Sequence, residues 1–180
     1  MMHLEFKSAE FPACRHGYLV NIPAKEGSAG IEGDSRLFRV SAYNWSKNTS
    51  IEQVRLVCEA ISPNFVQGCL SLNSHLPVPL RAMHDRSDGM QRSQGGITIH
   101  PGERAFFDVV AKIIRPDEPV YLCTAVKDMT LVFPPQRTVL TLSLYGRNID
   151  KETQSFVVEE EDDGDLVFYP QQAPSLAQAQ

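Results

Sequence analysis

The stretch ITIHPGERAFFDVVAKII, residues 97–114, decides the fold class. Pro101 presets the φ angle of the second position of a β-turn, and Gly102 accepts the positive φ that a type II turn requires at the third. Beyond the turn, every second residue to 113 falls on one apolar face: Ala105, Phe107, Val109, Ala111 and Ile113. Such alternation is typical of a strand with one buried side. The stretch therefore predicts two strands of one sheet joined by a tight turn.

The same alternation recurs on both sides of this stretch. Residues 36–43, 51–62 and 138–145 each predict a strand with an inward apolar face. The inward residues are Phe38, Val40 and Ala42, then Val54, Leu56, Cys58 and Ala60, and finally Leu140, Leu142 and Leu144. The Asn- and Ser-rich segment 44–50 joins the first two runs, which predicts a hairpin. Residues 154–160 and 165–169 predict a second hairpin around an acidic turn.

The remaining segments read as short strands, edges and loops, with no convincing helix. Pro77 and Pro79 exclude a central strand because proline lacks the N–H of the ladder, so LPVPLR (76–81) is expected at an edge. In total, about eight short strands predict an all-β antiparallel sandwich over residues 34–169. Residues 1–33 are expected to form an irregular extension with one possible strand near 17–22. Residues 170–180 are expected to be disordered.

Five segments, taken in their order along the chain, resemble a known type of domain. They are IEQVRLVCEAISP (51–63), LPVPLRAMHD (76–85), IHPGERAFFDVV (99–110), RTVLTLSLYGRN (137–148) and DDGDLVF (162–168). This order resembles an immunoglobulin-like β-sandwich module of uncharacterised bacterial proteins. It is similar, more distantly, to accessory sandwich domains with a PGE pattern. The resemblance implies an immunoglobulin-like fold over residues 34–169 and no particular activity.

Composition and charge narrow the classes of function. The net charge of −5 arises from the acids of positions 159–165, and the rest of the chain is close to neutral. A nucleic-acid binder needs a dense basic face, so none is expected. No run approaches the roughly 18 apolar residues of a membrane span. Without a secretory signal or a CxxC pair, a reduced cytoplasmic protein is expected, although a Cys58–Cys123 bridge between two sheets stays open.

No motif carries catalytic chemistry. The histidines show no metal-ligand spacing, and no nucleophile has a base at a recognisable spacing, so we expect no enzyme, metal or cofactor. An enzyme with an unrecognised site remains an alternative. The acidic run EEEDDGDL (159–166) supplies carboxylates of the kind that bind calcium, while a hairpin turn with solvated charges needs no ion.

The long polar segment 81–92 is the candidate binding site. Loops of this length on a rigid sandwich often bind partners, and Arg and Met are enriched at interfaces. The candidate residues are Arg81, Met83, His84, Arg86, Met90 and Arg92. With the LPVPLR edge they predict a non-enzymatic module that docks a protein. The alternative is a carbohydrate-binding module, which would need a row of exposed aromatic side chains; the candidates are Tyr43, Trp45, Phe106 and Tyr145.

Overall fold

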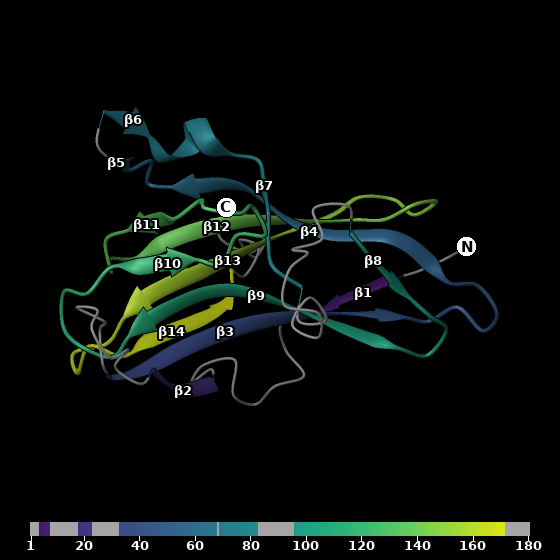
Figure 1. The fold of residues 1–180 in the computed structure, drawn as a ribbon, viewed down its shortest axis with the longest axis horizontal. Coiled ribbons are helices and arrows are strands. Elements are labelled where there is room, and N and C mark those ends of the chain that lie inside the picture. The colour runs from purple at the N-terminus through teal and green to yellow at the C-terminus, as the bar shows by residue number, and fades with distance from the viewer. Residues whose placement is uncertain (1–3, 8–17, 23–32, 68, 83–95, 172–180) are drawn as a thin grey trace, which may run out of the picture.

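Strands make up nearly all of the regular structure in the computed structural model, which describes residues 4–7, 18–22, 33–67, 69–82 and 96–171 (Figure 1). The strands are β1 (Leu4–Lys7), β2 (Tyr18–Ile22), β3 (Gly33–Asn44), β4 (Ile51–Ser62), β5 (Val66–Gln67), β6 (Leu70–Ser71), β7 (Val78–Pro79), β8 (Ile97–Ile99), β9 (Arg104–Ile113), β10 (Val120–Leu122), β11 (Leu131–Phe133), β12 (Thr138–Tyr145), β13 (Glu152–Glu160) and β14 (Leu166–Pro170). One 3-10 turn, η1 (Leu72–His75), follows β6. The predicted all-β class is confirmed.

Two antiparallel sheets form the body of the molecule. Sheet 1 has the order β1-β3-β9-β10-β11, with β2 also paired to β3. Sheet 2 has the order β14-β13-β12-β4-β7, with β8 also paired to β4. The two-residue strands β5 and β6 make a separate small hairpin.

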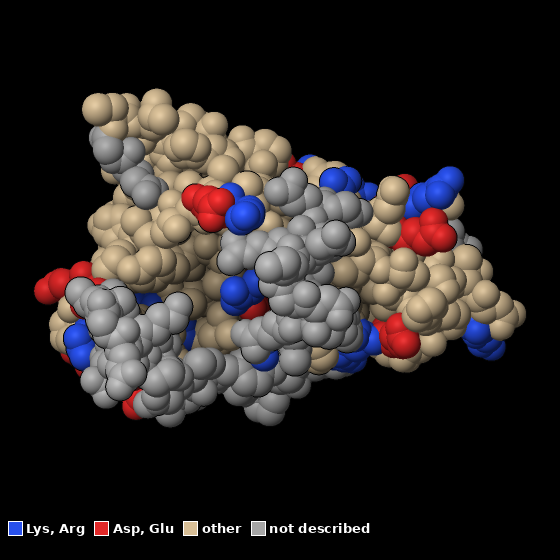
Figure 2. Space-filling model, in the orientation of Figure 1, with Lys and Arg blue, Asp and Glu red and all other residues tan. Residues whose placement is uncertain are grey.

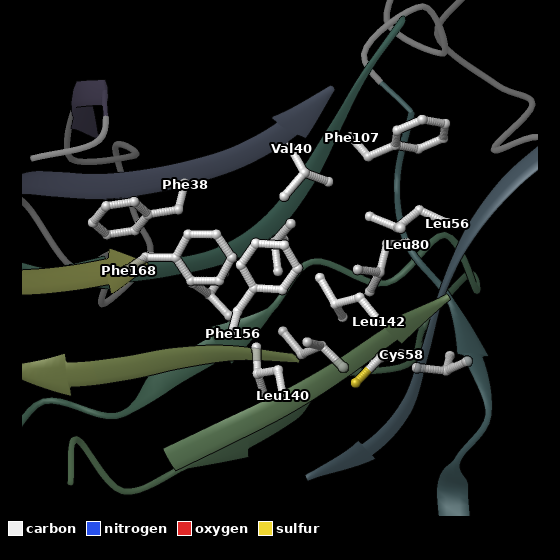
Figure 3. Packing of buried hydrophobic residues seen from close by; sticks show 14 of the residues in the cluster. Phe38, Val40, Leu56, Cys58, Leu80, Phe107, Leu140, Leu142, Phe156 and Phe168 are labelled. Atoms are coloured by element: carbon white, nitrogen blue, oxygen red, sulfur yellow. The ribbon is translucent and has the colours of Figure 1, made fainter. Parts of the chain in front are cut away.

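The core lies between the inner faces of the two sheets (Figure 3). Phe156 and Phe168 of sheet 2 stack at a ring distance of 4.9 Å, and Phe38 of sheet 1 lies 5.5 Å from Phe168. Leu140, Leu142 and Leu144 are fully buried, as predicted. Burying each side chain of this size stabilises the fold by about 1.5–3 kcal/mol.

The segment from Val78 to Ala82 joins the sheets along one side. β7 pairs with β4 of sheet 2, and the chain then crosses to sheet 1, where Leu80 bridges to Thr124 and Ala82 bridges to Phe107. Pro79 lies in β7, the last strand in the order of sheet 2, at the edge where it was predicted, and Pro77 lies just before this strand. This crossing brings Arg81 beside β9.

Two predicted strand pairings are wrong. The turn at Pro101-Gly102 forms as expected, because Gly102 has φ +74° and the Glu103 N–H donates to the His100 carbonyl at 3.0 Å. However, β8 pairs with β4 in sheet 2 and β9 pairs with β3 in sheet 1, so the turn crosses between sheets. β3 and β4 likewise lie in different sheets and form no hairpin. Alternation shows which side of a strand is buried, but not which sheet the strand joins.

Two shifts in the register of strand pairing change which residues face the core, compared with the sequence prediction. Phe38 pairs with Val110 and Arg39 with Asp108, so Val109 is an extra residue on β9. Before this bulge the odd-numbered residues of β9 face the core, and after it the even-numbered ones do. Lys112 therefore points inward, although the alternation in the sequence predicted it outside. A second shift, opposite Thr141 and Leu142, leaves Ala60 half-buried and buries Ile61 in its place.

Two strands lie within the predicted N-terminal extension. The strand expected near 17–22 is present as β2, and β1 pairs with the other end of β3. Most of the tail predicted to be disordered, from 172 on, lies outside the described residues. Among the described residues, no helix has the length and apolar character needed to cross a membrane.

Candidate partner-binding surface

The outer face of sheet 1 carries a row of aromatic and arginine side chains. Directly opposed residues of an antiparallel pair share a face. Because Val40 and Ala42 point into the core, the intervening residues of β3 and their partners on β9 point outward. With Trp45 after β3 and Arg81 beside β9, they form the aromatic–arginine row: Arg39, Tyr43, Trp45, Arg81, Arg104 and Phe106.

Trp45 is the exposed end of this row. Its side chain is 56% exposed, which is unusual for a residue of this size in an ordered turn. The indole ring meets Tyr43 edge-on at 4.6 Å, and the Arg104 guanidinium lies 5.4 Å from the centre of the Tyr43 ring. Arg104 also reaches Ser41. Trp45 is therefore an exposed aromatic ring that packs against Tyr43, and the Tyr43 ring in turn forms a cation–π pair with Arg104.

Asn44 fixes the backbone beneath Trp45. Its side chain is fully buried, and its Nδ2 donates to the carbonyls of Thr49 and Ile99, each at 2.9 Å. Its Oδ1 accepts the Ser46 N–H at 2.9 Å, and its carbonyl accepts the Gly102 N–H at 3.0 Å. One side chain thus ties the β3–β4 turn to the β8–β9 turn and makes the Trp45 end of the row rigid.

The other end of the row rests on a buried carboxylate. Asp108 has no exposed surface; its Oδ1 accepts from Arg39 Nε at 2.6 Å, and its Oδ2 accepts from Arg81 Nε and Nη2 at 2.9 and 2.7 Å. The Arg81 side chain is 32% exposed and that of Arg39 10%. Two guanidinium groups thus bind one buried carboxylate, and the Arg81 group is partly open to solvent.

Of the six residues predicted for partner binding, the structure describes Arg81. Its N–H donates to Cys123 and its carbonyl accepts from the Asp108 N–H, so its backbone is fixed to sheet 1. The other five, Met83, His84, Arg86, Met90 and Arg92, lie outside the described residues. Figure 2 shows basic and acidic side chains intermingled, with no large area of one charge on the part of this face that is not grey.

Three of the four aromatic candidates share the outer face of sheet 1, and the fourth does not. Tyr145 lies on sheet 2, where its hydroxyl donates to Glu59 and Lys151 lies over its ring. Lys151 also forms an ion pair with Glu59 at 2.9 Å. The hydrogen bond from Tyr145 and the contact with Lys151 lower the pKa of Glu59 below its ordinary value.

The acidic turn between β13 and β14 is bound by basic side chains from sheet 1. The hairpin itself forms as predicted. Arg36 holds the Asp165 carboxylate with two donors, one of them Nε at 2.9 Å. Buried Lys112 lies 2.9 Å from Glu160 Oε1, an ion pair without the geometry of a hydrogen bond. These two pairs join the sheets at the end opposite Trp45.

Lys112 also binds the backbone around this turn. Its Nζ donates to the carbonyls of Arg115 at 2.5 Å and Gly164 at 2.7 Å. Gly164 has φ +82° and lies so close to the chain before β10 that an added Cβ would come within 2.5 Å of Pro116 N. In the described part of the chain, no three His, Cys, Asp or Glu side chains are grouped as a metal site.

The cysteines that the structure describes are free thiols. Cys58 is buried in sheet 2, Cys123 is half-buried and Cys69 is exposed, so the Cys58–Cys123 bridge left open by the sequence is not formed. Burial raises the pKa of the Cys58 thiol to about 12, which leaves it protonated and unreactive at neutral pH.

The chain matches no protein-family model, no curated protein and no solved structure. Its function must therefore be argued from its own residues. Three of the residues that shape the surface were missed by sequence reasoning: Asn44, Asp108 and Arg39. The sequence held a signal for Asp108 and a basic partner, because an aspartate within the apolar run FFDVV needs a cation beside it; it held none for Asn44.

Proposed function

We propose that this chain is a non-enzymatic, cytoplasmic β-sandwich module of the immunoglobulin-like type that docks a protein partner. The docking surface is the aromatic–arginine row on sheet 1, which includes Arg81 of the predicted binding residues. The observation that carries the proposal is the exposed Trp45 ring, which packs against Tyr43 and follows the buried Asn44 in the chain. Trp, Tyr and Arg are the residues most enriched among binding hot spots.

The chemistry of the row indicates the chemistry of the partner. The row carries three guanidinium groups, and those of Arg39 and Arg81 bind the Asp108 carboxylate. A partner segment with acidic side chains complements these arginines, and a large apolar side chain packs on Trp45. Electrostatic attraction of this kind speeds association and weakens as salt is added.

A carbohydrate-binding module is the second candidate, because Tyr43, Trp45 and Phe106 share one outer face. Sugar rings stack on open aromatic faces. Here the Arg104 guanidinium lies over one face of Tyr43, and Phe106 is half-buried. The arrangement therefore favours a protein partner over a sugar.

The proposal is tested by selecting a displayed peptide library on the wild-type chain and measuring the affinity of the enriched peptides. We expect peptides with several acidic residues and one large apolar residue. The substitutions Trp45→Ala and Arg104→Ala should each weaken binding tenfold or more. Tyr145→Ala removes an aromatic side chain from the opposite sheet and is the matched control, for which unchanged affinity is expected.

Equal binding by the wild-type chain and the Trp45→Ala variant would contradict the proposed surface. The carbohydrate alternative is tested by electrophoresis through gels that contain soluble polysaccharides. Retardation of the wild-type chain that Trp45→Ala abolishes would overturn the protein-docking proposal in favour of a sugar ligand.

A further inference from the structure

The Arg81 guanidinium uses one of its two hydrogen-bonding edges within the fold. Its Nε and Nη2 donate to the same carboxylate oxygen, Asp108 Oδ2, at 2.9 and 2.7 Å. A guanidinium has a second pair of parallel N–H groups, one on Nη1 and one on the outer side of Nη2. No described residue accepts from this pair, and the Arg81 side chain is 32% exposed. We call this pair the Arg81 fork.

The backbone and the side chain of Arg81 are both held in place. Its N–H donates to the Cys123 carbonyl, and its carbonyl accepts the Asp108 N–H, both at 2.9 Å. The residues on either side, Leu80 and Ala82, form bridges to sheet 1. Asp108 is fully buried, so the carboxylate that orients the guanidinium is fixed as well. A donor preorganised in this way loses little conformational freedom when it binds a ligand.

The shape of the Arg81 fork indicates the group that it binds. Two parallel N–H groups match the two oxygens of a carboxylate. A phosphoryl group has three oxygens and is usually recognised by a cluster of arginines. At this end of the row the Arg39 side chain is only 10% exposed, which leaves Arg81 as the more accessible guanidinium. A single open fork therefore favours a carboxylate over a phosphoryl group.

The strand register sets the distance between the Arg81 fork and Trp45. Asp108, beside the fork, and Arg104 are four residues apart on β9, which is roughly 13 Å at the rise of an extended strand. Arg104 pairs with Tyr43, and the Trp45 ring packs on Tyr43. Because Trp45 follows β3 and Arg81 lies on the other side of β9, the separation is somewhat larger than this. An extended peptide spans it in four or more positions.

We propose that the Arg81 fork binds the carboxylate of an acidic residue in the partner segment, four or six positions from the large apolar residue that packs on Trp45. Alternate residues of an extended segment point to the same side, so the spacing is even. The inference rests on the proposed docking function, and it adds the contact and the spacing that define the partner.

Blocked synthetic peptides test the spacing. Each carries one Glu and one Leu in a threonine background, separated by one to seven positions in either order, and isothermal titration calorimetry measures the affinity for the full chain. We expect the tightest binding at separations of four or six. Tightest binding with the two residues adjacent, or no dependence on the separation, would overturn the proposal.

A double-mutant cycle on the tightest peptide tests the contact. Arg81→Lys keeps a positive charge beside Asp108 but has no fork, and replacing the peptide's Glu by Gln removes the carboxylate without any change to the protein. Each change should weaken binding about tenfold, and the two together should weaken it no further. Arg137→Lys, at an exposed arginine that pairs with Glu159 on sheet 2, is the matched control and should leave the affinity unchanged. Additive effects of the two changes would contradict a direct contact.

The same peptides separate this inference from the proposed function. If Trp45→Ala weakens binding while Arg81→Lys binds the Glu and Gln peptides as the wild type does, the docking row stands and the role of the fork is wrong. If both variants bind as the wild type does, the proposed surface is wrong as well. Failure of every peptide to bind would overturn the inference, whereas the library selection still decides the proposed function.

A phosphoserine peptide tests the nature of the anion. With phosphoserine in place of Glu, we expect affinity no higher than that of the Glu peptide. Tighter binding by the phosphoserine peptide, lost in Arg81→Lys, would show that the fork takes a phosphoryl group and would overturn the assignment of a carboxylate.

Discussion

The Nδ2 of Asn44 donates to the carbonyl of Ile99 at 2.9 Å, which links the end of β3 in sheet 1 to the end of β8 in sheet 2. The adjacent residue in the chain is Trp45, the most exposed ring of the proposed docking row. The amide that joins the two sheets therefore also positions the central residue of the proposed docking row. The proposal thus couples fold stability and recognition at this end of the molecule.

Replacing Asn44 with Ala should destabilise the fold by about 3 kcal/mol, because it leaves two carbonyls and one N–H without their partner. Urea denaturation measures the loss. Asn48→Ala, an exposed position in the same turn, is the control and should be nearly neutral. Equal stability of the two variants would show that Asn44 does not hold the turns together.

Replacing Lys112 with Met should destabilise the fold by about 3 kcal/mol, because the Glu160 carboxylate and three backbone carbonyls lose a buried cation. Thermal or urea unfolding measures the change. Lys127→Met removes the same charge from an exposed position and should have little effect. A Lys112→Met variant as stable as the wild type would contradict the role of this lysine in joining the sheets.

The sequence predicted local structure well and long-range pairing poorly. The turn at Pro101-Gly102 and the buried leucines of β12 were predicted, because they follow from residue chemistry and strand period. The sheet assignment of β8 and the inward side chain of Lys112 were not. They depend on which strands meet and on a bulge at Val109, which no local pattern marks.

The candidate site was predicted only in part. The choice of Arg81 came from loop composition, and the structure attaches it to buried Asp108 instead of leaving it as a loop residue. The sequence offered Trp45 only as one of four aromatic residues, scattered along the chain, that could bind carbohydrate. Its contact with Tyr43 requires the turn conformation that Asn44 imposes, and asparagine in a turn carries no mark of such a role.

Calcium should not stabilise this protein. In the acidic turn, Asp165 is bound by Arg36 and Glu160 lies against Lys112, so two of the carboxylates that could bind an ion already have basic partners. Melting temperatures in excess calcium and in chelator should agree within experimental error. A rise of several degrees with calcium would show that the turn exchanges its basic partners for the ion.

Glu59 should stabilise the fold at neutral pH and less in acid. Its pKa in the folded state lies below the ordinary value of 4.5, so its contribution is complete above that value and is lost as the pH falls through the folded pKa. Because Lys151 is exposed and Glu59 is only half-buried, Glu59→Gln should lower stability by at most about 1 kcal/mol at pH 7. Urea unfolding should show this difference shrinking below pH 4.5. A difference that grows in acid would contradict the sign of the shift.

The fluorescence of Trp45 tests the central claim most directly, because this is the only tryptophan in the chain. As an acidic peptide selected on the wild-type chain is titrated in, burial of the indole should shift its emission to shorter wavelength and reduce quenching by acrylamide. Both changes should saturate together with binding. A peptide that binds to saturation while the emission and quenching of Trp45 stay unchanged would show that the partner docks elsewhere.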